Sequence, residues 1–109
     1  MLNVVFERKW KRVYINGQQV DIWTSQDVQT IDIAFDWGNR SASTHQLALG
    51  ILYMLTGDKD FAKQHGEALM NEYLSKVDTS QDVVAWSKLD EWVVNHGGVL
   101  KQRYNTDMV

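Results

Sequence analysis

The stretch 30-TIDIAFDWGNRSASTHQLALGILYMLT-56 contains the change in hydrophobic period that decides the fold class. Over residues 30–37, apolar side chains alternate with polar or small ones, which is the period of a strand with one buried face. The apolar face consists of Ile31, Ile33, Phe35 and Trp37. The opposite face carries Asp32 and Asp36. We therefore expect a half-buried strand with an acidic outer face, as in an antiparallel sheet covered on one side.

Residues 44–56 change to a helical period, and apolar residues surround most of the circumference. This pattern predicts the central and most buried helix of the protein. Ser43 followed three residues later by Gln46 matches a capping box, which predicts where the helix begins. Gly57 is the expected stop at its C-terminal end.

The residues before this stretch predict a β-hairpin. Residues 4–15 are rich in branched and aromatic side chains and predict the first strand. Asn16-Gly17 follows, a strong signal for a two-residue hairpin turn. A second strand over residues 19–24 would pair back across this turn.

The residues after the central helix predict two more helices. Asp58 or Asp60 caps a helix over residues 60–77, which has an apolar stripe and a charged opposite face. A last short helix covers residues 87–95, and the tail over residues 99–104 fits either an edge strand or a further helical turn. The sequence thus predicts a single compact α+β domain over residues 1–109. About three antiparallel N-terminal strands would pack against about three C-terminal helices.

Composition excludes several classes of protein. A chain of 109 residues with 44% hydrophobic residues is long and apolar enough for one cored domain. With no cysteine it holds neither a disulfide nor a cysteine-ligated zinc ion. His45, His65 and His96 are far apart in sequence and have no partner at the spacing of zinc sites. We expect no metal and no cofactor.

No segment of the sequence indicates a membrane protein. Its longest apolar run falls well short of the roughly 20 residues that a membrane span needs. The N-terminal residues lack the basic-then-apolar order of a signal peptide. We expect a cytoplasmic protein with no membrane partner.

An acidic segment supplies the first candidate site. Residues 20–37 hold four aspartates and no basic residue, in a chain with a formal net charge of −3. An acidic surface suits a basic partner, and an exposed tryptophan within it would serve as an anchor. The candidate protein-binding residues are Asp21, Trp23, Asp27, Asp32 and Asp36.

A basic and aromatic segment supplies the second candidate site. Single-stranded nucleic acid is bound by cations interleaved with stacking rings on a sheet. The candidate residues are Arg8, Lys9, Trp10, Lys11, Arg12 and Tyr14. The same residues also fit ordinary cross-strand neighbours, with charges that protect an edge strand, and we favour this structural interpretation.

The junction before the central helix supplies the third candidate site. A helix N-terminus beside an arginine can hold a phosphate or carboxylate. The candidate anion-binding residues are Asn39, Arg40, Ser41 and Ser43. A hydroxyl-capped helix entered by a tight turn explains the same residues without a ligand, and no glycine-rich phosphate motif is present. We favour the capped helix.

The same junction offers little for catalysis. Ser41 or Ser43, His45 and Asp36 could form a triad on paper, but no nucleophile-elbow pattern surrounds either serine. We expect no catalytic residues. An enzyme or small-ligand binder would need a concave pocket lined by Asp36, Arg40 and His45.

The five tryptophans divide into two groups. Periodicity assigns Trp37, Trp86 and Trp92 to the core. Trp10 and Trp23 lie on the predicted hairpin, where either becomes an interface anchor if it is exposed.

Several short motifs resemble one family. They are Arg12-Val13-Tyr14, Phe35-Asp36-Trp37-Gly38, Gln46-Leu47-Ala48-Leu49-Gly50-Ile51-Leu52, and the late Trp86, Leu89 and Trp92. Over roughly residues 10–95 the chain resembles the family called domain of unknown function 6166. It departs at Ser41-Ala42-Ser43-Thr44, where relatives tend to have Gly-Ser-Gly-Pro, which weakens the idea of a ligand-cradling loop. The resemblance implies a small compact α+β domain of bacterial or phage origin, and supplies no activity, cofactor or catalytic residue.

Our leading hypothesis is a small non-enzymatic interaction protein from a bacterium, phage or other mobile element. It would bind a host or self protein through its acidic surface. In one version it inhibits a host defence complex, with the acidic face occupying a nucleic-acid groove. The alternative is a nucleic-acid-binding module that uses the basic and aromatic segment.

Overall fold

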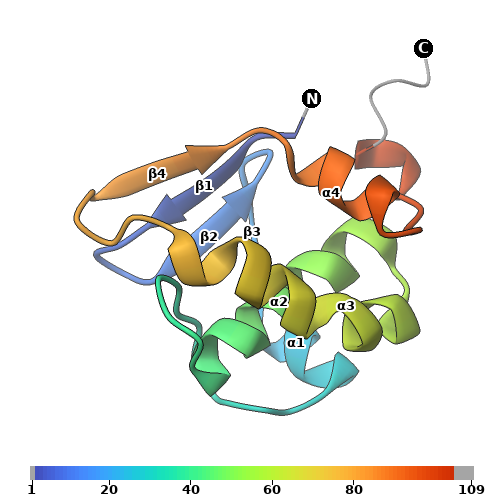
Figure 1. Ribbon diagram of the computed structural model, residues 1–109, viewed down its shortest axis with the longest axis horizontal. Coiled ribbons are helices and arrows are strands. Elements are labelled where there is room, and N and C mark those ends of the chain that lie inside the picture. Colours follow the sequence, from blue (N-terminus) through green and yellow to red (C-terminus); the bar gives the residue numbers. More distant parts are fainter. Residues whose placement is uncertain (1, 105–109) are drawn as a thin grey trace.

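The computed structural model describes residues 2–104 and has an antiparallel sheet beside a group of helices (Figure 1). The α+β class is confirmed, although within this part of the chain there are four strands and four α-helices rather than three of each. The strands are β1 (Val4–Glu7), β2 (Arg12–Ile15), β3 (Gln18–Gln19) and β4 (Val83–Trp86). The α-helices are α1 (Ile22–Val28), α2 (Ala42–Thr56), α3 (Lys59–Glu72) and α4 (Leu89–Asn95). Two short 3-10 helices are η1 (Leu74–Lys76) and η2 (Gln102–Tyr104).

The N-terminal hairpin differs from the single long strand expected over residues 4–15. The chain reverses between β1 and β2 at residues 8–11, where Lys11 has a φ of 52°. β1 and β2 then pair antiparallel, from Val4 opposite Ile15 to Glu7 opposite Arg12. The predicted turn at Asn16-Gly17 is confirmed between β2 and β3. The sheet order is β3-β2-β1-β4.

The strand expected over residues 19–24 is wrong after its first residue. β3 ends at Gln19, and the chain enters helix α1. The carboxylate of Asp21 caps this helix by accepting hydrogen bonds from the N–H of Thr24 at 3.0 Å and from its hydroxyl at 2.8 Å. A short polar side chain at a helix start outweighs the weak strand propensity of its neighbours.

The strand expected over residues 30–37 is also wrong, because this segment is a loop. No neighbouring strand satisfies its backbone. Instead the side-chain oxygen of Gln46 accepts hydrogen bonds from the N–H groups of Ile31 and Asp32, at 2.7 and 2.9 Å. The alternating pattern is only partly obeyed, since Trp37 is buried while Ile33 is 83% exposed.

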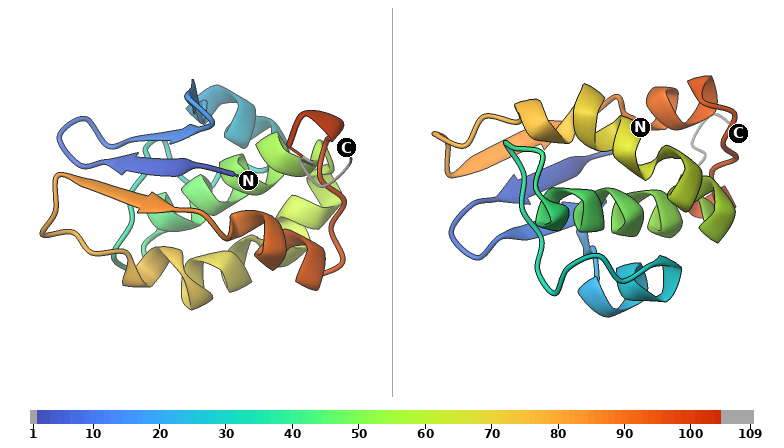
Figure 2. Two further views of the ribbon diagram at one scale, coloured as in Figure 1. Left: turned by 90° about the horizontal axis from the view of Figure 1, so that it is seen from above. Right: turned by 60° about the horizontal axis from the view of Figure 1, so that its bottom comes forward.

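Helix α2 is the central buried helix that its pattern predicts. It lies between α1 and α3, as Figure 2 shows. It begins two residues before the expected start, because the cap is Ser41, whose hydroxyl accepts a hydrogen bond from the Thr44 N–H at 3.3 Å. The predicted capping box of Ser43 and Gln46 is therefore wrong. The predicted stop at Gly57 is confirmed by its left-handed φ of 67°.

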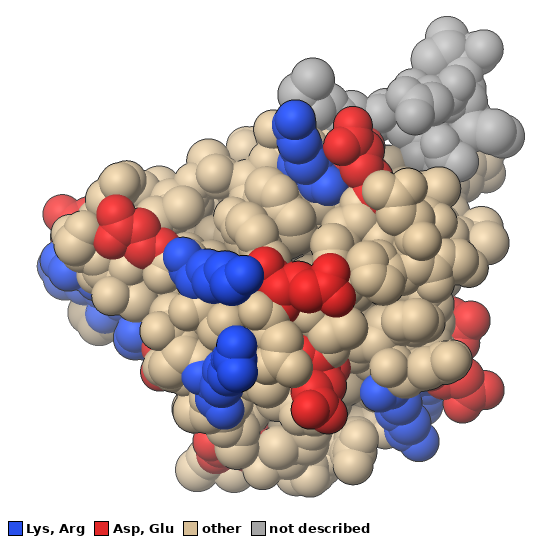
Figure 3. Space-filling model, in the orientation of Figure 1, with Lys and Arg blue, Asp and Glu red and all other residues tan. Residues whose placement is uncertain are grey.

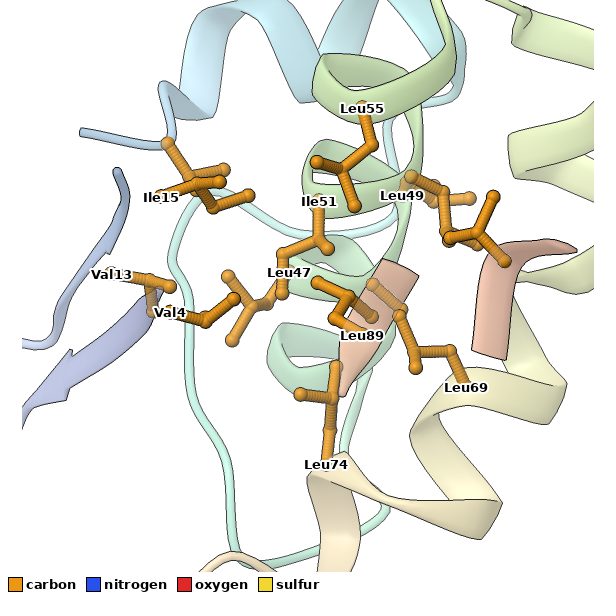
Figure 4. Close-up of a cluster of buried hydrophobic side chains, with 14 of the residues drawn as sticks. Val4, Val13, Ile15, Leu47, Leu49, Ile51, Leu55, Leu69, Leu74 and Leu89 are labelled. Carbon is orange, nitrogen blue, oxygen red and sulfur yellow. The ribbon is translucent and has the colours of Figure 1, made fainter. Parts of the chain in front are cut away.

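The core forms where the sheet meets α2 and α3. Figure 4 shows side chains of β1, β2, α2 and α3 converging with Leu74 and Leu89. On the sheet, Val4, Phe6, Val13 and Ile15 point into this core and are buried. Burying each large apolar side chain contributes about 1.5–3 kcal/mol, so this cluster is the main source of stability.

The C-terminal third contains a strand that its pattern did not reveal. Of the two predicted caps of α3, Asp58 is the correct one, but the chain after η1 returns as β4 and pairs antiparallel with β1. Trp86 lies in β4 rather than in a helix, and its ring stacks on Tyr73 at a centroid distance of 3.5 Å. Of the two alternatives for the tail, the helical turn is correct, as η2. In the described part of the chain, no helix has the length and apolar character needed to cross a membrane.

Candidate functional site

Trp10 and Trp23 are brought to the same depression on the surface. Both are strongly exposed, at 61% and 73%, although large apolar side chains are usually buried. The depression has a volume of about 460 Å³. We call it the tryptophan groove, and it is lined by Trp10, Lys11, Arg12, Gln19, Val20, Asp21, Ile22, Trp23, Ile33, Ala34 and Phe35.

Three separate segments hold the apolar parts of this groove. Trp10 lies at the tip of the turn between β1 and β2. Trp23 lies in the first turn of α1, two residues after the Asp21 cap. Ile33, 83% exposed, comes from the loop that joins α1 to α2 and runs beside the sheet in Figure 2. Exposed apolar patches and exposed tryptophans are both enriched at protein interfaces.

The turn that carries Trp10 is fixed at both ends. The guanidinium of Arg8 donates hydrogen bonds to the Asp82 carboxylate at 2.6 Å and to the Thr79 carbonyl at 3.1 Å. The ammonium of Lys11 donates to the Asp36 carboxylate at 2.9 Å and lies 4.9 Å from the centroid of the Trp37 ring. Trp10 is therefore presented on a restrained turn, which lowers the entropy cost of binding.

Positive charge surrounds the Trp10 ring. The ammonium of Lys9 lies 5.3 Å from the ring centroid, and the guanidinium carbon of Arg12 lies 5.9 Å from it. Neither cation forms an ion pair within residues 2–104. The Trp10 side of the groove thus offers an aromatic surface together with two cations free to meet carboxylates or phosphates.

The acidic residues of the first candidate site have different environments. Asp21 caps α1 and lines the groove beside Trp23. Asp27 is exposed on α1. Asp32 accepts hydrogen bonds from the Ser43 hydroxyl at 2.6 Å and from the Ile33 N–H at 2.7 Å, which hold the pKa of its carboxyl below the ordinary value. The four aspartates therefore do not form one free acidic face.

Asp36 belongs to a closed network. Burial opposes its ionisation, but hydrogen bonds from Lys11, the Asn39 amide and the Trp37 N–H outweigh this effect. The pKa of the Asp36 carboxyl consequently lies below its ordinary value. This carboxylate therefore links the turn between β1 and β2 to the loop before α2.

The third candidate site is occupied by the protein's own groups. The side-chain oxygen of Asn39 accepts hydrogen bonds from the Ser41 N–H at 2.9 Å and the Thr44 hydroxyl at 2.7 Å. Ser43 donates to Asp32, so a carboxylate of the same chain already lies beside the start of α2. Arg40 is exposed. The capped-helix interpretation accounts for these contacts without an added anion.

The residues of the second candidate site differ in their contacts. Arg8 and Lys11 are paired with Asp82 and Asp36, respectively. Tyr14 is half-buried on the outer face of the sheet, opposite Val5 and Gln19. Figure 3 shows Lys and Arg side chains at the left edge of this face with Asp or Glu side chains directly above them, so charges of both signs are mixed there as elsewhere on the face.

The residues needed for a catalytic pocket do not converge. Asp36 faces Lys11 and Asn39, whereas the ring of His45 packs against Gly66 of α3. Asp36, Arg40 and His45 line neither the tryptophan groove nor the smaller hollow of about 260 Å³ between β3, α1, α2 and residues 101–104. The concave pocket that an enzyme or small-ligand binder would need from these three residues is therefore not formed at either hollow.

The fold assembles one cluster that spacing along the chain did not indicate. The rings of His65 and His96 lie 5.8 Å apart, and His96 also stacks on Trp92 at 3.8 Å. The Trp92 indole N–H donates to the Glu72 carboxylate at 3.2 Å. In residues 2–104, no three potential ligand side chains lie close enough together to hold a metal ion. Only the packing of α4 on α3 reveals this cluster.

Comparison with known proteins gives a family and no activity. A family model described as "Family of unknown function (DUF6166)" matches residues 7–100, which agrees with the resemblance noted from the motifs. No curated protein and no solved structure matches the chain.

Proposed function

The chain belongs to the family of unknown function DUF6166, and we propose that it is a non-enzymatic interaction protein that binds a protein partner through the tryptophan groove. The observation that carries this proposal is the joint exposure of Trp10 and Trp23 on one depression. Tryptophan, tyrosine and arginine dominate binding hot spots, and the groove combines two tryptophans with Arg12.

The contacts of the groove suggest the chemistry of the partner. Ile33 and the two tryptophans would receive an apolar or aromatic side chain, while Lys9 and Arg12 favour a neighbouring carboxylate. Because Asp32 and Asp36 are held by internal hydrogen bonds, the acidic surface is a weaker basis for binding than the groove. Inhibition of a defence complex by a bacterial or phage protein is one biological setting for such an interaction.

The proposal is tested by affinity capture from a lysate of the organism that encodes the protein. The immobilised proteins are the wild type, Trp10→Ala and Trp23→Ala, with Val99→Ala as the matched control. Val99 is 79% exposed but lies outside the groove. A stoichiometric partner should bind the wild type and the control and lose about 2 kcal/mol, roughly 30-fold in affinity, with either tryptophan variant. Equal retention by all four proteins would count against the groove.

A second candidate function is binding of single-stranded nucleic acid at Trp10. The two cations beside its exposed ring are the observation in its favour. Arg8 and Lys11 already have carboxylate partners, so few phosphates would be neutralised and the salt dependence of binding would be shallow. Titration of a labelled oligonucleotide at low salt, with Arg12→Ala as the variant, separates this function from protein binding.

A further inference from the structure

Strand β4 leaves an unpaired backbone edge on the sheet. In the order β3-β2-β1-β4 it pairs only with β1. The Asp82 carbonyl accepts a hydrogen bond from the Arg8 N–H at 2.9 Å, so the backbone of Asp82 faces β1. Backbone direction alternates along an antiparallel strand, and therefore the N–H and C=O groups of Val83 and Ala85 point away from β1. Within residues 2–104, no other group hydrogen-bonds to them.

This edge lacks several of the features by which proteins protect exposed strands. β4 has the sequence VVAW, with no charge and no proline, and its register with β1 runs through all of its residues without a bulge. The side chain of Val83 is 55% exposed, and Ala85 is exposed. In Figure 1 no other element lies along the outer side of β4. The opposite edge, β3, is only two residues long and continues into the segment that leads to α1.

We propose that β4 pairs with β4 of a second copy of this chain, antiparallel and centred on Val84. In this register Val83 of one copy lies opposite Ala85 of the other, and both pairs exchange their free backbone hydrogen bonds. The two sheets join into one, and the interface is isologous, because each copy presents the same surface.

The charges at the two ends of β4 select this arrangement. Asp82 precedes the strand and Lys88 follows it, and both are exposed. Antiparallel pairing places Asp82 of one copy opposite Trp86 of the other, two residues from Lys88, while Asp82 also accepts a hydrogen bond from Arg8 of its own chain at 2.6 Å. Parallel pairing would instead place like charges side by side, which is destabilising. Lys88 forms no ion pair within residues 2–104, so it is free for this contact.

The side chains of β4 would also pair well with those of β4 in a second copy. Val83 and Ala85 would form apolar cross-strand pairs on the outer face of the joined sheet. On the other face, Val84 would meet Val84 of the second copy. This central pair is of the non-hydrogen-bonded type, with Cα atoms about 4.5 Å apart, which is within the range that a disulfide spans.

Sedimentation velocity over a range of protein concentrations tests the proposal. The wild type should shift from the 12.6 kDa monomer toward twice that mass. Ala85→Pro removes an outward N–H and should weaken dimerisation more than tenfold. Lys88→Glu should weaken it by up to about fivefold through like-charge contact. This second variant preserves the fold, because a carboxylate at the start of α4 suits the helix dipole.

Oxidative cross-linking tests the register. The chain contains no cysteine, so Val84→Cys introduces a single thiol. It should form a disulfide-linked dimer, whereas Val94→Cys, on an exposed position of α4, should not. A wild type that stays monomeric at every concentration would overturn the proposal. So would a dimer that keeps its affinity in Ala85→Pro and yields no Val84→Cys cross-link. β4 does not line the tryptophan groove, and Trp23 lies outside the hollow that Trp10 shares with Asp82 and Val83, so Trp23→Ala tests binding at the groove independently of these outcomes.

Discussion

The side-chain amide of Gln46 donates a hydrogen bond to the Ser25 hydroxyl at 2.9 Å, and both side chains are completely buried. The same amide donates to the Gln29 carbonyl at 3.1 Å, and its oxygen accepts from two N–H groups of the loop after α1. One side chain of α2 thus holds α1 and the loop that carries Ile33, which forms part of the tryptophan groove.

Replacing Gln46 should destabilise the protein strongly. Gln46→Leu keeps the size but leaves three part-buried backbone groups and the buried Ser25 hydroxyl without this partner, which we expect to cost about 2–4 kcal/mol of unfolding free energy. Denaturant unfolding measures this loss. Gln64→Leu is the control, because Gln64 is exposed on α3, and it should change stability by less than about 0.5 kcal/mol. Similar effects of the two substitutions would contradict the role assigned to Gln46.

Gly38 permits the close approach of the loop before α2 to the segment after η1. Its φ is +79°, and an added Cβ would lie 2.2 Å from the Thr79 side chain and 3.2 Å from the Val77 carbonyl. Gly38→Ala should therefore cost more than backbone strain alone, about 3 kcal/mol in total. Gly97→Ala isolates the strain, because Gly97 has a φ of +86° and nothing within 4 Å, and should cost about 1 kcal/mol. Thermal unfolding should rank the variants in this order, and the reverse order would refute the packing argument.

The Asp36 network should make part of the stability depend on acid pH. Its pKa is lowered in the folded state, so the stabilisation is present above the unfolded pKa of about 3.9 and is lost as the pH falls through the folded value. Asp36→Asn should be about 1 kcal/mol less stable than wild type at neutral pH, and the two should converge in acid. Unfolding free energies from pH 7 downward measure the gap. Asp27→Asn, at an exposed position, should differ from the wild type at no pH in this range. A difference in unfolding free energy between the wild type and Asp36→Asn that stays constant with pH would contradict the prediction.

Tyr73 should govern part of the alkaline response. Burial raises its pKa to about 12 from an ordinary value of 10.0, so the unfolded state ionises first. Stability from this group is complete below pH 10 and falls as the pH rises toward about 12. Tyr73→Phe, which keeps the ring stacked on Trp86, should show a flatter decline in denaturant unfolding than wild type. Tyr14→Phe, on the outer face of the sheet, is the control. If its stability fell as little with rising pH as that of Tyr73→Phe, the effect could not be assigned to Tyr73.

The parts of the fold governed by local contacts were predictable from the sequence. Asp58, Gly57 and the Asn16-Gly17 turn act within a few residues of their position in the chain. Helix α2 is predictable because apolar residues lie around most of its circumference. These features need no knowledge of distant partners.

The wrong predictions concern segments whose backbone hydrogen bonds are made with groups far away in the sequence. Residues 30–37 alternate like a strand, but Gln46 satisfies their backbone. β4 was missed because its four residues become a strand only through pairing with β1, far away in sequence. For the site, the sequence predicts that Trp10 or Trp23 acts as an anchor if its side chain is exposed, and both side chains are exposed. Their meeting in one groove depends on α1, whose first three residues belong to the strand expected over residues 19–24.

The central claim, that the tryptophan groove receives a protein partner, is tested most directly by site-specific photo-cross-linking. A photoreactive phenylalanine derivative replaces Ile33 at the rim of the groove or, as control, Val99 outside it. In a lysate of the native organism, the probe at position 33 should yield one cross-linked partner that disappears when Trp23→Ala is added, and the probe at position 99 should yield none. The same products from both positions, or a product at position 33 that persists with Trp23→Ala, would contradict the account.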